Sequence, residues 1–295
     1  MTTRINFNNI TLDPITFSEE EKDTRFSILR LDKIHPQISG NKWFKLRYYL
    51  DEAIKENKKL LTFGGAWSNH ILATAAACNE NKIECAAIIR GEEPPSYSPV
   101  LQFAKEKGMK LFFVGREEYR DSFIPDNIPK ENYLIVPQGG YGKPGAKGAG
   151  EILDHCKKED YSHICCAAGT GTMAAGLINA STQGQKIAII SVLKNHRGLE
   201  NDISALITNH EAAWKVFHEY HCGGYAKYSP DLINFMKDLY TRTKIPTDFV
   251  YTGKLCYAIS RLQNDHAFPA GSNVLLIHSG GLMGNLSLSL SLPLS

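Results

Sequence analysis

The chain has 295 residues, of which 43% are hydrophobic, enough to bury one large core or two smaller ones. Charged residues make up 22% and the formal net charge is +2, which argues against a nucleic-acid-binding surface or a disordered acidic tail. No run of about 18 apolar residues occurs, so no membrane span is predicted. The N-terminal segment lacks the apolar core of a secretion signal, and we expect a cytoplasmic protein.

The seven cysteines are odd in number and form no C-x-x-C pair. Most of them stand in apolar or small-residue segments such as "HICCAAG". Small buried thiols in a reducing compartment explain this pattern better than disulfides or a zinc site, and no metal site is predicted.

Short apolar runs alternate with amphipathic stretches along the chain. Unbroken apolar strands that alternate with helices are typical of parallel sheets covered on both faces. The pattern predicts strands over 59–65, 83–90, 109–115, 132–140, 162–169, 186–194, 214–221 and 273–281. It predicts helices over 68–82, 98–108, 150–158, 172–181, 229–243 and 254–263.

A Gly-rich segment over 137–151, "PQGGYGKPGAKGAGE", divides this pattern into two halves. It can be a flexible junction between two α/β lobes or a loop that contacts a ligand, since ligands of open α/β folds lie outside strand C-termini. The low-complexity tail over 286–295 alternates leucine and serine. Pro293 weakens an edge-strand interpretation, and we assign this end no function.

One strand-turn-helix segment, "HICCAAGTGTMAAGL", suits a phosphate. Gly169 and Gly171 allow close backbone approach, Thr170 and Thr172 add hydroxyls, and free N–H groups point outward at the helix start. A plain tight turn is at least as common for an isolated Gly-rich turn. The segment also fits a dinucleotide fingerprint, but the next strand ends in "SVLKNH" without the required acid, so a monophosphate fits better.

A second turn, "FGGAWSNHILATAAA", offers Ser68 as an N-cap and places His70 in the first helical turn. Its N–H groups and helix dipole suit a carboxylate, although Ser68 can simply cap the helix while His70 packs beneath it. Further turns carry Ser279 in "IHSGG", Tyr251 and Thr252 in "VYTGK", and Tyr225 beside glycines. A phosphate cradle, a carboxylate cradle, a lysine and aromatic faces together indicate an amino-acid enzyme that uses pyridoxal phosphate.

These motifs, with "SGNKWFKL", resemble in the same order those of the 1-aminocyclopropane-1-carboxylate deaminase and D-cysteine desulfhydrase family, over about residues 20–285. The resemblance implies pyridoxal-phosphate fold type II: α/β, with two open, twisted, mostly parallel sheets and helices on both faces, as in tryptophan synthase β. It also implies a homodimer. We expect a small domain over 46–148, inserted in a large cofactor-binding domain over 1–45 and 149–295.

The resemblance implies a role for each matched residue. Lys42 matches the lysine that forms a Schiff base with the cofactor and moves the substrate's Cα proton. Tyr251 matches the tyrosine beside the pyridine ring, and Tyr225 a second active-site tyrosine. The remaining matches are Lys45 near the phosphate, Asn69 on the cofactor's phenolic oxygen, Ser68, Asn69 and His70 around the substrate carboxylate, Gly169, Thr170, Gly171 and Thr172 around the phosphate, and Ser279 near the ring nitrogen.

Departures from the family pattern bear on the reaction. Trp67 replaces a glutamine and is expected to reshape the substrate pocket, and Phe44 replaces an arginine. Thr252 stands where the deaminase has glutamate, and Ser279 where it tends to have leucine. Neutral hydroxyls near the ring nitrogen make a weaker electron sink than a carboxylate, which suffices when a good leaving group is at Cβ.

We therefore predict α,β-elimination from a small amino acid, with D-cysteine as the first candidate and pyruvate, hydrogen sulfide and ammonia as products. Deamination of 1-aminocyclopropane-1-carboxylate is the alternative. A catalytically weak protein that binds pyridoxal phosphate or a small ligand is an alternative of another class. A retained Lys42 argues against that last alternative, because a pure binder needs no amine base.

Overall fold

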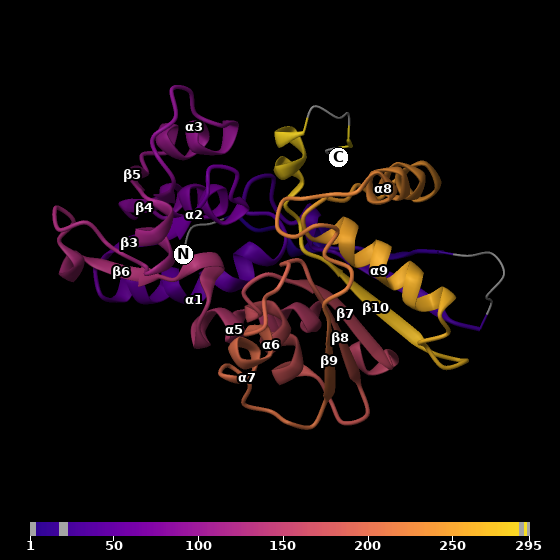
Figure 1. The fold of residues 1–295 in the computed structure, drawn as a ribbon. Helices are drawn as coiled ribbons and strands as arrows, with labels where there is room; N and C mark the ends of the chain where they lie inside the picture. The colour runs from indigo at the N-terminus through magenta and orange to yellow at the C-terminus, as the bar shows by residue number, and fades with distance from the viewer. Residues whose placement is uncertain (1–3, 18–22, 289–291, 294–295) are drawn as a thin grey trace.

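The computed structural model describes residues 4–17, 23–288 and 292–293. Two sheets form its framework (Figure 1). The larger sheet consists, in spatial order, of β1 (Leu12–Pro14), β2 (Arg25–Arg30), β10 (Asn273–His278), β7 (His163–Ala168), β8 (Lys186–Ser191) and β9 (Ala213–Phe217). The smaller sheet consists of β5 (Lys110–Val114), β4 (Cys85–Arg90), β3 (Lys59–Gly64) and β6 (Tyr133–Val136).

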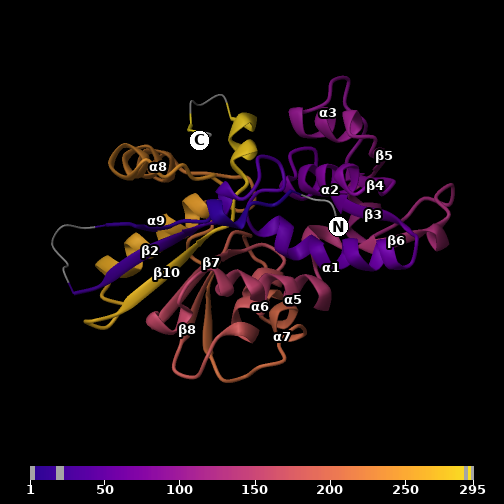
Figure 2. The same cartoon turned by 180° about the vertical axis from the view of Figure 1, so that it is seen from behind.

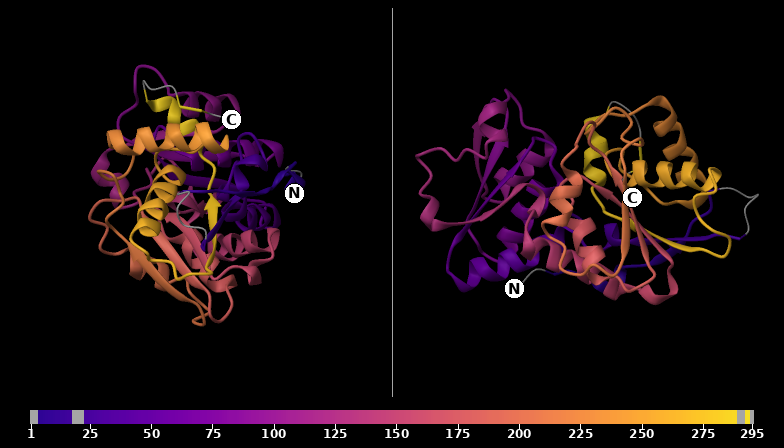
Figure 3. Two further views of the ribbon diagram at one scale, coloured as in Figure 1. Left: turned by 90° about the vertical axis from the view of Figure 1, so that its right-hand side faces the viewer. Right: turned by 60° about the horizontal axis from the view of Figure 1, so that its bottom comes forward.

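Strand pairing is parallel throughout both sheets except between β1 and β2. The two sheets and their helices lie side by side, with the indigo-to-magenta part next to the orange and yellow part (Figure 3). The predicted fold class, two open and mostly parallel sheets flanked by helices, is confirmed.

Helices cover both faces of the larger sheet. In β7, Ile164 and Cys166 pack into the core shared with α1 (Asn41–Lys55), α5 (Lys143–Gly150) and α6 (Thr172–Ala180). Cys165 and Ala167 point the other way, into the core formed with α8 (Pro230–Thr243) and α9 (Thr252–Asn264). Burial on both faces is why this strand is an unbroken apolar run in the sequence.

The smaller sheet is covered in the same way. One face packs against α1, α2 (Asn69–Glu80) and α3 (Pro99–Glu106), and the other against α4 (Arg116–Arg120). The remaining α-helix of the described chain is α7 (Leu199–Ser204). Short 3-10 turns complete the chain: η1 (Phe7–Asn9), η2 (Leu31–Lys33), η3 (Lys130–Asn132), η4 (Gln138–Gly140), η5 (Glu151–His155), η6 (Lys158–Asp160) and η7 (Leu282–Ser287).

The Gly-rich segment is not a flexible junction, which corrects one of its two interpretations. Most of it is α5, which packs between α1 and α6 (Figure 2). A Cβ on Gly148 would lie 1.8 Å from the Phe44 carbonyl oxygen, so this glycine permits close contact with α1. The helix predicted over 150–158 is instead the end of α5 followed by the 3-10 turns η5 and η6.

Three turns follow the carboxyl ends of β3, β7 and β10. They contain Ser68, Gly169–Gly171 and Ser279–Gly281, the segments that carry the predicted motifs. Carboxyl ends of parallel strands form the usual ligand-binding edge of such sheets. In the described part of the chain, no helix is long and apolar enough to cross a membrane. Of the predicted Leu/Ser tail, residues 289–291 and 294–295 lie outside the described residues.

Candidate active site

A cavity of about 520 Å³ lies where the two sheets meet. Residues from both sheets and from α1 line it, so neither sheet forms the site alone. Among the predicted site residues, those on its wall are Lys42, Lys45, Ser68, Asn69, His70, Gly169, Thr170, Gly171, Tyr225 and Tyr251.

Lys42 lies in the first turn of α1 and lines this cavity. Its Nζ donates a hydrogen bond of 2.6 Å to Asn41 Oδ1 and lies 5.7 Å from the centroid of the Tyr251 ring. Burial lowers the pKa of the Lys42 amine to about 8, against an opposing effect of Asp248. A substantial part of Lys42 is therefore an uncharged amine near neutral pH, as a nucleophile or proton acceptor requires.

Lys45 lies one helical turn further along α1 and is buried. Its Nζ donates to the Gly139 carbonyl oxygen at 3.2 Å. Burial and the nearby Lys42 charge lower the pKa of the Lys45 amine well below its ordinary value. Neither lysine forms an ion pair with a carboxylate of the described chain, so an anion in the cavity would relieve the cost of burying them.

The turn between β7 and α6 faces the same cavity. Within the described chain, the N–H groups of Gly169, Thr170 and Gly171 donate no hydrogen bond. Gly171 has a φ of +77°, which favours glycine, and it is the N-cap of the nine-residue α6. Thr172 is buried behind this turn, and its Oγ1 lies 2.9 Å from Thr170 Oγ1. Free N–H groups at a helix start form an anion cradle.

The turn before α2 forms a second cradle. Ser68 caps α2, its Oγ accepting from the Ile71 N–H at 3.4 Å. Asn69 Nδ2 donates to the Gly281 carbonyl oxygen at 3.2 Å, while Asn69 Oδ1 is buried without a hydrogen-bond partner in the described chain. His70 Nε2 lies 2.9 Å from Thr62 Oγ1, which itself donates to the Val136 carbonyl oxygen.

That arrangement fixes the protonation of His70. Because Thr62 donates its own hydrogen to Val136, it accepts from His70 Nε2–H, which leaves Nδ1 as an acceptor. Burial, followed by the charges of Lys42 and Lys45, lowers the pKa of His70 to about 3. His70 is therefore neutral, and its Nδ1 is buried without a partner in the residues described here.

Two tyrosines, Tyr225 and Tyr251, border the cavity. The rings of Tyr225 and Tyr251 meet edge to face, with centroids 6.3 Å apart. Burial raises the pKa of both phenols, so both stay protonated and can donate hydrogen bonds. Thr252 and Ser279 lie behind this wall, fully buried, with their hydroxyl oxygens 3.3 Å apart.

Trp67 does not line the cavity, although we expected it to shape the substrate pocket. Its side chain is 36% exposed. The turn that aims Ser68 at the cavity leaves the neighbouring indole at the surface. A direct role for Trp67 in substrate binding thus stays a prediction.

Comparison with known proteins identifies the family. The model of the pyridoxal-phosphate dependent enzymes matches residues 12–280. The chain belongs to this family. It is 26% identical over 295 aligned residues to the bifunctional D-cysteine desulfhydrase/1-aminocyclopropane-1-carboxylate deaminase of Arabidopsis thaliana, a mitochondrial protein; the match covers 88% of this chain and 73% of that protein.

Further similar proteins agree with this assignment. A candidate 1-aminocyclopropane-1-carboxylate deaminase of Thermotoga maritima is 29% identical, with 83% of this chain and 85% of that protein covered. The crystal structure of a homologue of the deaminase superposes with a TM-score of 0.80 at 23% identity, covering 96% of this chain and 93% of that one. The protein is a pyridoxal-phosphate dependent enzyme.

The residues of this pyridoxal-phosphate dependent enzyme fit its cofactor. The phosphate is an anion, and the α6 cradle would supply free N–H groups, while Lys45 would regain its proton and its positive charge beside that anion. The aldehyde requires an uncharged amine, which Lys42 supplies. Asn69, with one amide hydrogen engaged by Gly281, retains a second for the cofactor's phenolic oxygen.

Two buried residues escaped the sequence analysis. Asp248 accepts hydrogen bonds from the N–H groups of Val250, Tyr251 and Thr252 at 2.8–3.0 Å and so shapes the turn that holds Tyr251. An Asp before a helix start is a capping signal that could have revealed it. Lys254, fully buried, donates at 2.7 Å to the Gly224 carbonyl oxygen next to Tyr225. The hydrogen-bond partner of Lys254 is 30 residues away in the chain, so no local sequence pattern indicated this contact.

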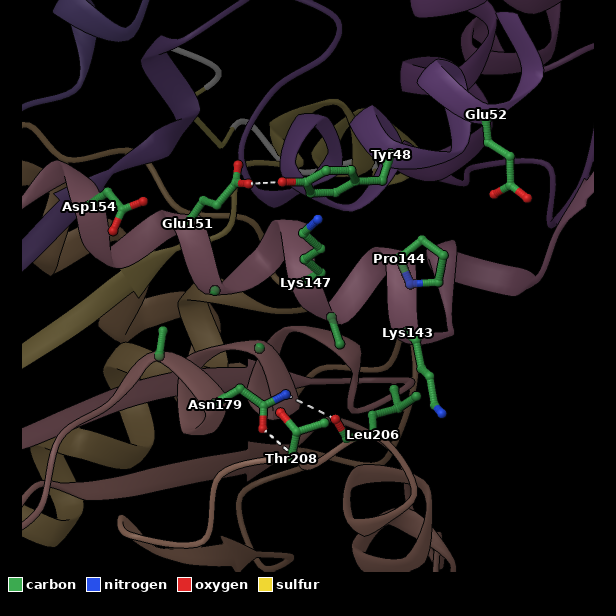
Figure 4. A pocket seen from close by; sticks show the side chains of 14 residues that line it. Tyr48, Glu52, Lys143, Pro144, Lys147, Glu151, Asp154, Asn179, Leu206 and Thr208 are labelled. Carbon is green, nitrogen blue, oxygen red and sulfur yellow. Dashed lines mark hydrogen bonds between the residues drawn. The ribbon is translucent and has the colours of Figure 1, made fainter. Parts of the chain in front are cut away.

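A larger hollow, of about 780 Å³, lies elsewhere between α1, α5 and α6 (Figure 4). It shares no lining residue with the candidate active site. Tyr48 donates a hydrogen bond to Glu151 there, and Lys147 lies over the Tyr48 ring. None of the predicted site residues lines this hollow.

Proposed function

We propose that this enzyme catalyses α,β-elimination of a small amino acid with a leaving group at Cβ. The observation that carries the proposal is the position of Lys42, an amine with a lowered pKa in a cavity that also contains two anion cradles. D-cysteine is the first candidate substrate, which the name of the Arabidopsis relative supports. For a leaving group X, the amino acid and water give a 2-oxo acid, ammonia and HX.

Each part of the site has a task in this reaction. The substrate carboxylate binds the N–H groups of Asn69 and His70 and the Ser68 hydroxyl at the start of α2. Lys42 Nζ takes the proton from Cα. The phenols of Tyr225 and Tyr251, protonated because burial raises their pKa, donate hydrogen bonds to the departing group. When bound, pyridoxal phosphate supplies an electron-withdrawing ring that stabilises negative charge at Cα.

The residues that the family resemblance places near the ring nitrogen favour elimination over opening of an unactivated ring, and in this structure they lie behind the cavity wall. Thr252 and Ser279 offer hydroxyls in place of a carboxylate, and they hydrogen-bond each other. Deamination of 1-aminocyclopropane-1-carboxylate is the second candidate, because relatives carry that name. The homodimer, the cytoplasmic location and the domain boundaries near residues 45 and 148 stay predictions of the same proposal.

Cofactor attachment and turnover test the proposal together. The purified protein should be yellow, and borohydride should fix the cofactor to the peptide that contains Lys42. Lys42→Ala should reduce 2-oxo acid release at least about 100-fold, because it removes the proton acceptor. Lys147→Ala removes a lysine outside the cavity and serves as the matched control.

The substrate panel contains both enantiomers of cysteine, serine and β-chloroalanine, and 1-aminocyclopropane-1-carboxylate. Pyruvate from D-cysteine supports the first candidate, and 2-oxobutanoate from the cyclopropane supports the second. A protein that binds the cofactor at Lys42 but releases no 2-oxo acid from any member would indicate a binding protein instead. A colourless protein that takes up no cofactor would contradict the enzyme proposal.

A further inference from the structure

Arg90 is a cation in the active-site cavity that the proposed reaction does not use. It is the last residue of β4 and lines the cavity beside the turn that precedes α2. A Cβ on Gly65 would lie 3.9 Å from Nη2 of Arg90, the one heavy atom within 4 Å apart from those of the neighbouring residues in the chain. The exposed Arg90 guanidinium therefore lies beside Gly65, next to the carboxylate cradle. No carboxylate of the described chain pairs with it.

Tyr119 lies behind Arg90, outside the wall of the cavity. Its side chain is only 8% exposed, and its ring lies 5.9 Å from Arg90 Cζ. The phenol oxygen is buried and lacks a hydrogen-bond partner in the described part of the chain. Because Tyr119 does not line the cavity, it contributes through its ring, over which the Arg90 guanidinium lies.

The remaining neighbours of Arg90 are also donors. Burial raises the pKa of Tyr119 to about 12, and Arg90 and Tyr225 lie close enough to influence it. Tyr225 also lines the cavity, and the charge of Arg90 acts on its phenol. Arg90 and Tyr225, hereafter the Arg90 cluster, thus join one full positive charge with one hydroxyl on the cavity wall.

We propose that the Arg90 cluster binds a second negative charge on the substrate's side chain. Resting on the proposed function, the inference narrows the substrate class to amino acids whose side chain, or the leaving group on it, carries a carboxylate or a similar anion. The phosphate and the α-carboxylate already have their own cradles at α6 and α2. Arg90 is therefore left for a third anionic group, which its planar fork can hold with two hydrogen bonds.

Binding of aspartate and asparagine tests this specificity, because the two differ by one charge at nearly equal size. Calorimetric titration of the cofactor-loaded protein, with both enantiomers of each, gives the ratio of the asparagine Kd to the aspartate Kd. The wild type should prefer aspartate by about tenfold or more. Arg90→Gln should bring that ratio close to one, and Tyr225→Phe should lower it by about threefold.

The control variant is Arg120→Gln. It removes an exposed arginine of α4 that does not line the cavity, and it should keep the wild-type ratio. Arg90→Lys retains the charge but not the planar fork of the guanidinium. Its Kd ratio should lie between those of the wild type and Arg90→Gln, and it provides the test if Arg90→Gln does not fold. A wild-type ratio near one, or a ratio that survives in Arg90→Gln, overturns the proposal. Because binding needs no elimination, aspartate preference without 2-oxo acid release from any substrate would support the Arg90 cluster while contradicting the proposed reaction.

Discussion

At the residue scale, Lys42 and Lys45 are the two lysines of the described chain that line the active-site cavity. Both amines are positioned by α1, yet each lacks a paired carboxylate in the part of the chain described. Desolvation favours the uncharged form of a lysine, whereas a nearby anion favours the charged one. The cavity thus prepares Lys42 as an amine, and an arriving phosphate would restore the charge of Lys45.

The reactivity of Lys42 should follow its lowered pKa. With a pKa of about 8, roughly a quarter of Lys42 is uncharged at pH 7.5, against roughly one in a thousand for an ordinary lysine. In stopped-flow absorbance, cofactor uptake by the cofactor-free protein should accelerate as pH rises, with a midpoint near pH 8, and level off about one unit above it. Nα-acetyl-lysine, whose side-chain amine is free, is the comparison in solution, with a midpoint near its ordinary pKa. A midpoint for the protein at that same higher pH would contradict this prediction.

At the element scale, glycines determine how closely helices and turns approach the site. Gly40 precedes α1 with a φ of +66° and a ψ of −142°, a conformation that side chains rarely adopt. A Cβ there would lie 1.9 Å from the Ser279 carbonyl oxygen, which accepts a hydrogen bond from the Asn41 N–H. The start of α1 is therefore fastened to the turn after β10, and Lys42 is aimed by that contact.

Gly40→Ala should lower the free energy of unfolding by about 3 kcal/mol or more, through backbone strain and steric overlap together. Gly184→Ala is the matched control, because Gly184 also has a positive φ, +88°, but open space around its Cβ position. That variant should lose only about 1–2 kcal/mol. Urea unfolding of both variants measures the difference, and equal losses would show that the contact with Ser279 carries no weight.

At the scale of the whole molecule, a buried charge network joins elements from both ends of the chain. Arg30 of β2 pairs with Asp32 at 2.7 Å and with Asp13 of β1 at 3.0 Å. His278 Nδ1, at the end of β10, lies 3.4 Å from Asp32. Burial opposes ionisation of Asp32, but His278 and Arg30 outweigh it and hold its pKa below the ordinary value. The network fixes the strand that leads into the Ser279 turn.

Asp32→Asn should lower the free energy of unfolding by about 3 kcal/mol at pH 7, because it leaves Arg30 partly unpaired in the interior. Since the folded-state pKa is lowered, the contribution of Asp32 is present above its unfolded value of 3.8 and is lost as pH falls below it. Urea unfolding at pH 7 and pH 3 should show a smaller difference at the lower pH. Asp121→Asn, at an exposed carboxylate, is the control, and a difference independent of pH would exclude this linkage.

Periodicity within a local stretch sufficed for most strands and helices after residue 59, since burial on both faces leaves an apolar run. It missed β1, β2, α1, α4 and α7. The segment of α5 was interpreted as a flexible junction or a ligand-contacting loop, because its glycines serve contacts with α1 and α6 that no local pattern records.

By itself, the sequence determined the order of the motifs and with it the cofactor class, because Lys42, Ser68, Gly169 and Tyr251 each follow a local turn signal. Only the tertiary structure decided which side chains share the cavity. It excluded Trp67 from the wall, placed Thr252 and Ser279 behind it, and brought Arg90 from β4 to within electrostatic reach of Tyr119 and Tyr225. The physical reason is that burial, pairing of charges and the pKa of an amine depend on segments distant in the chain, and only folding brings those segments together.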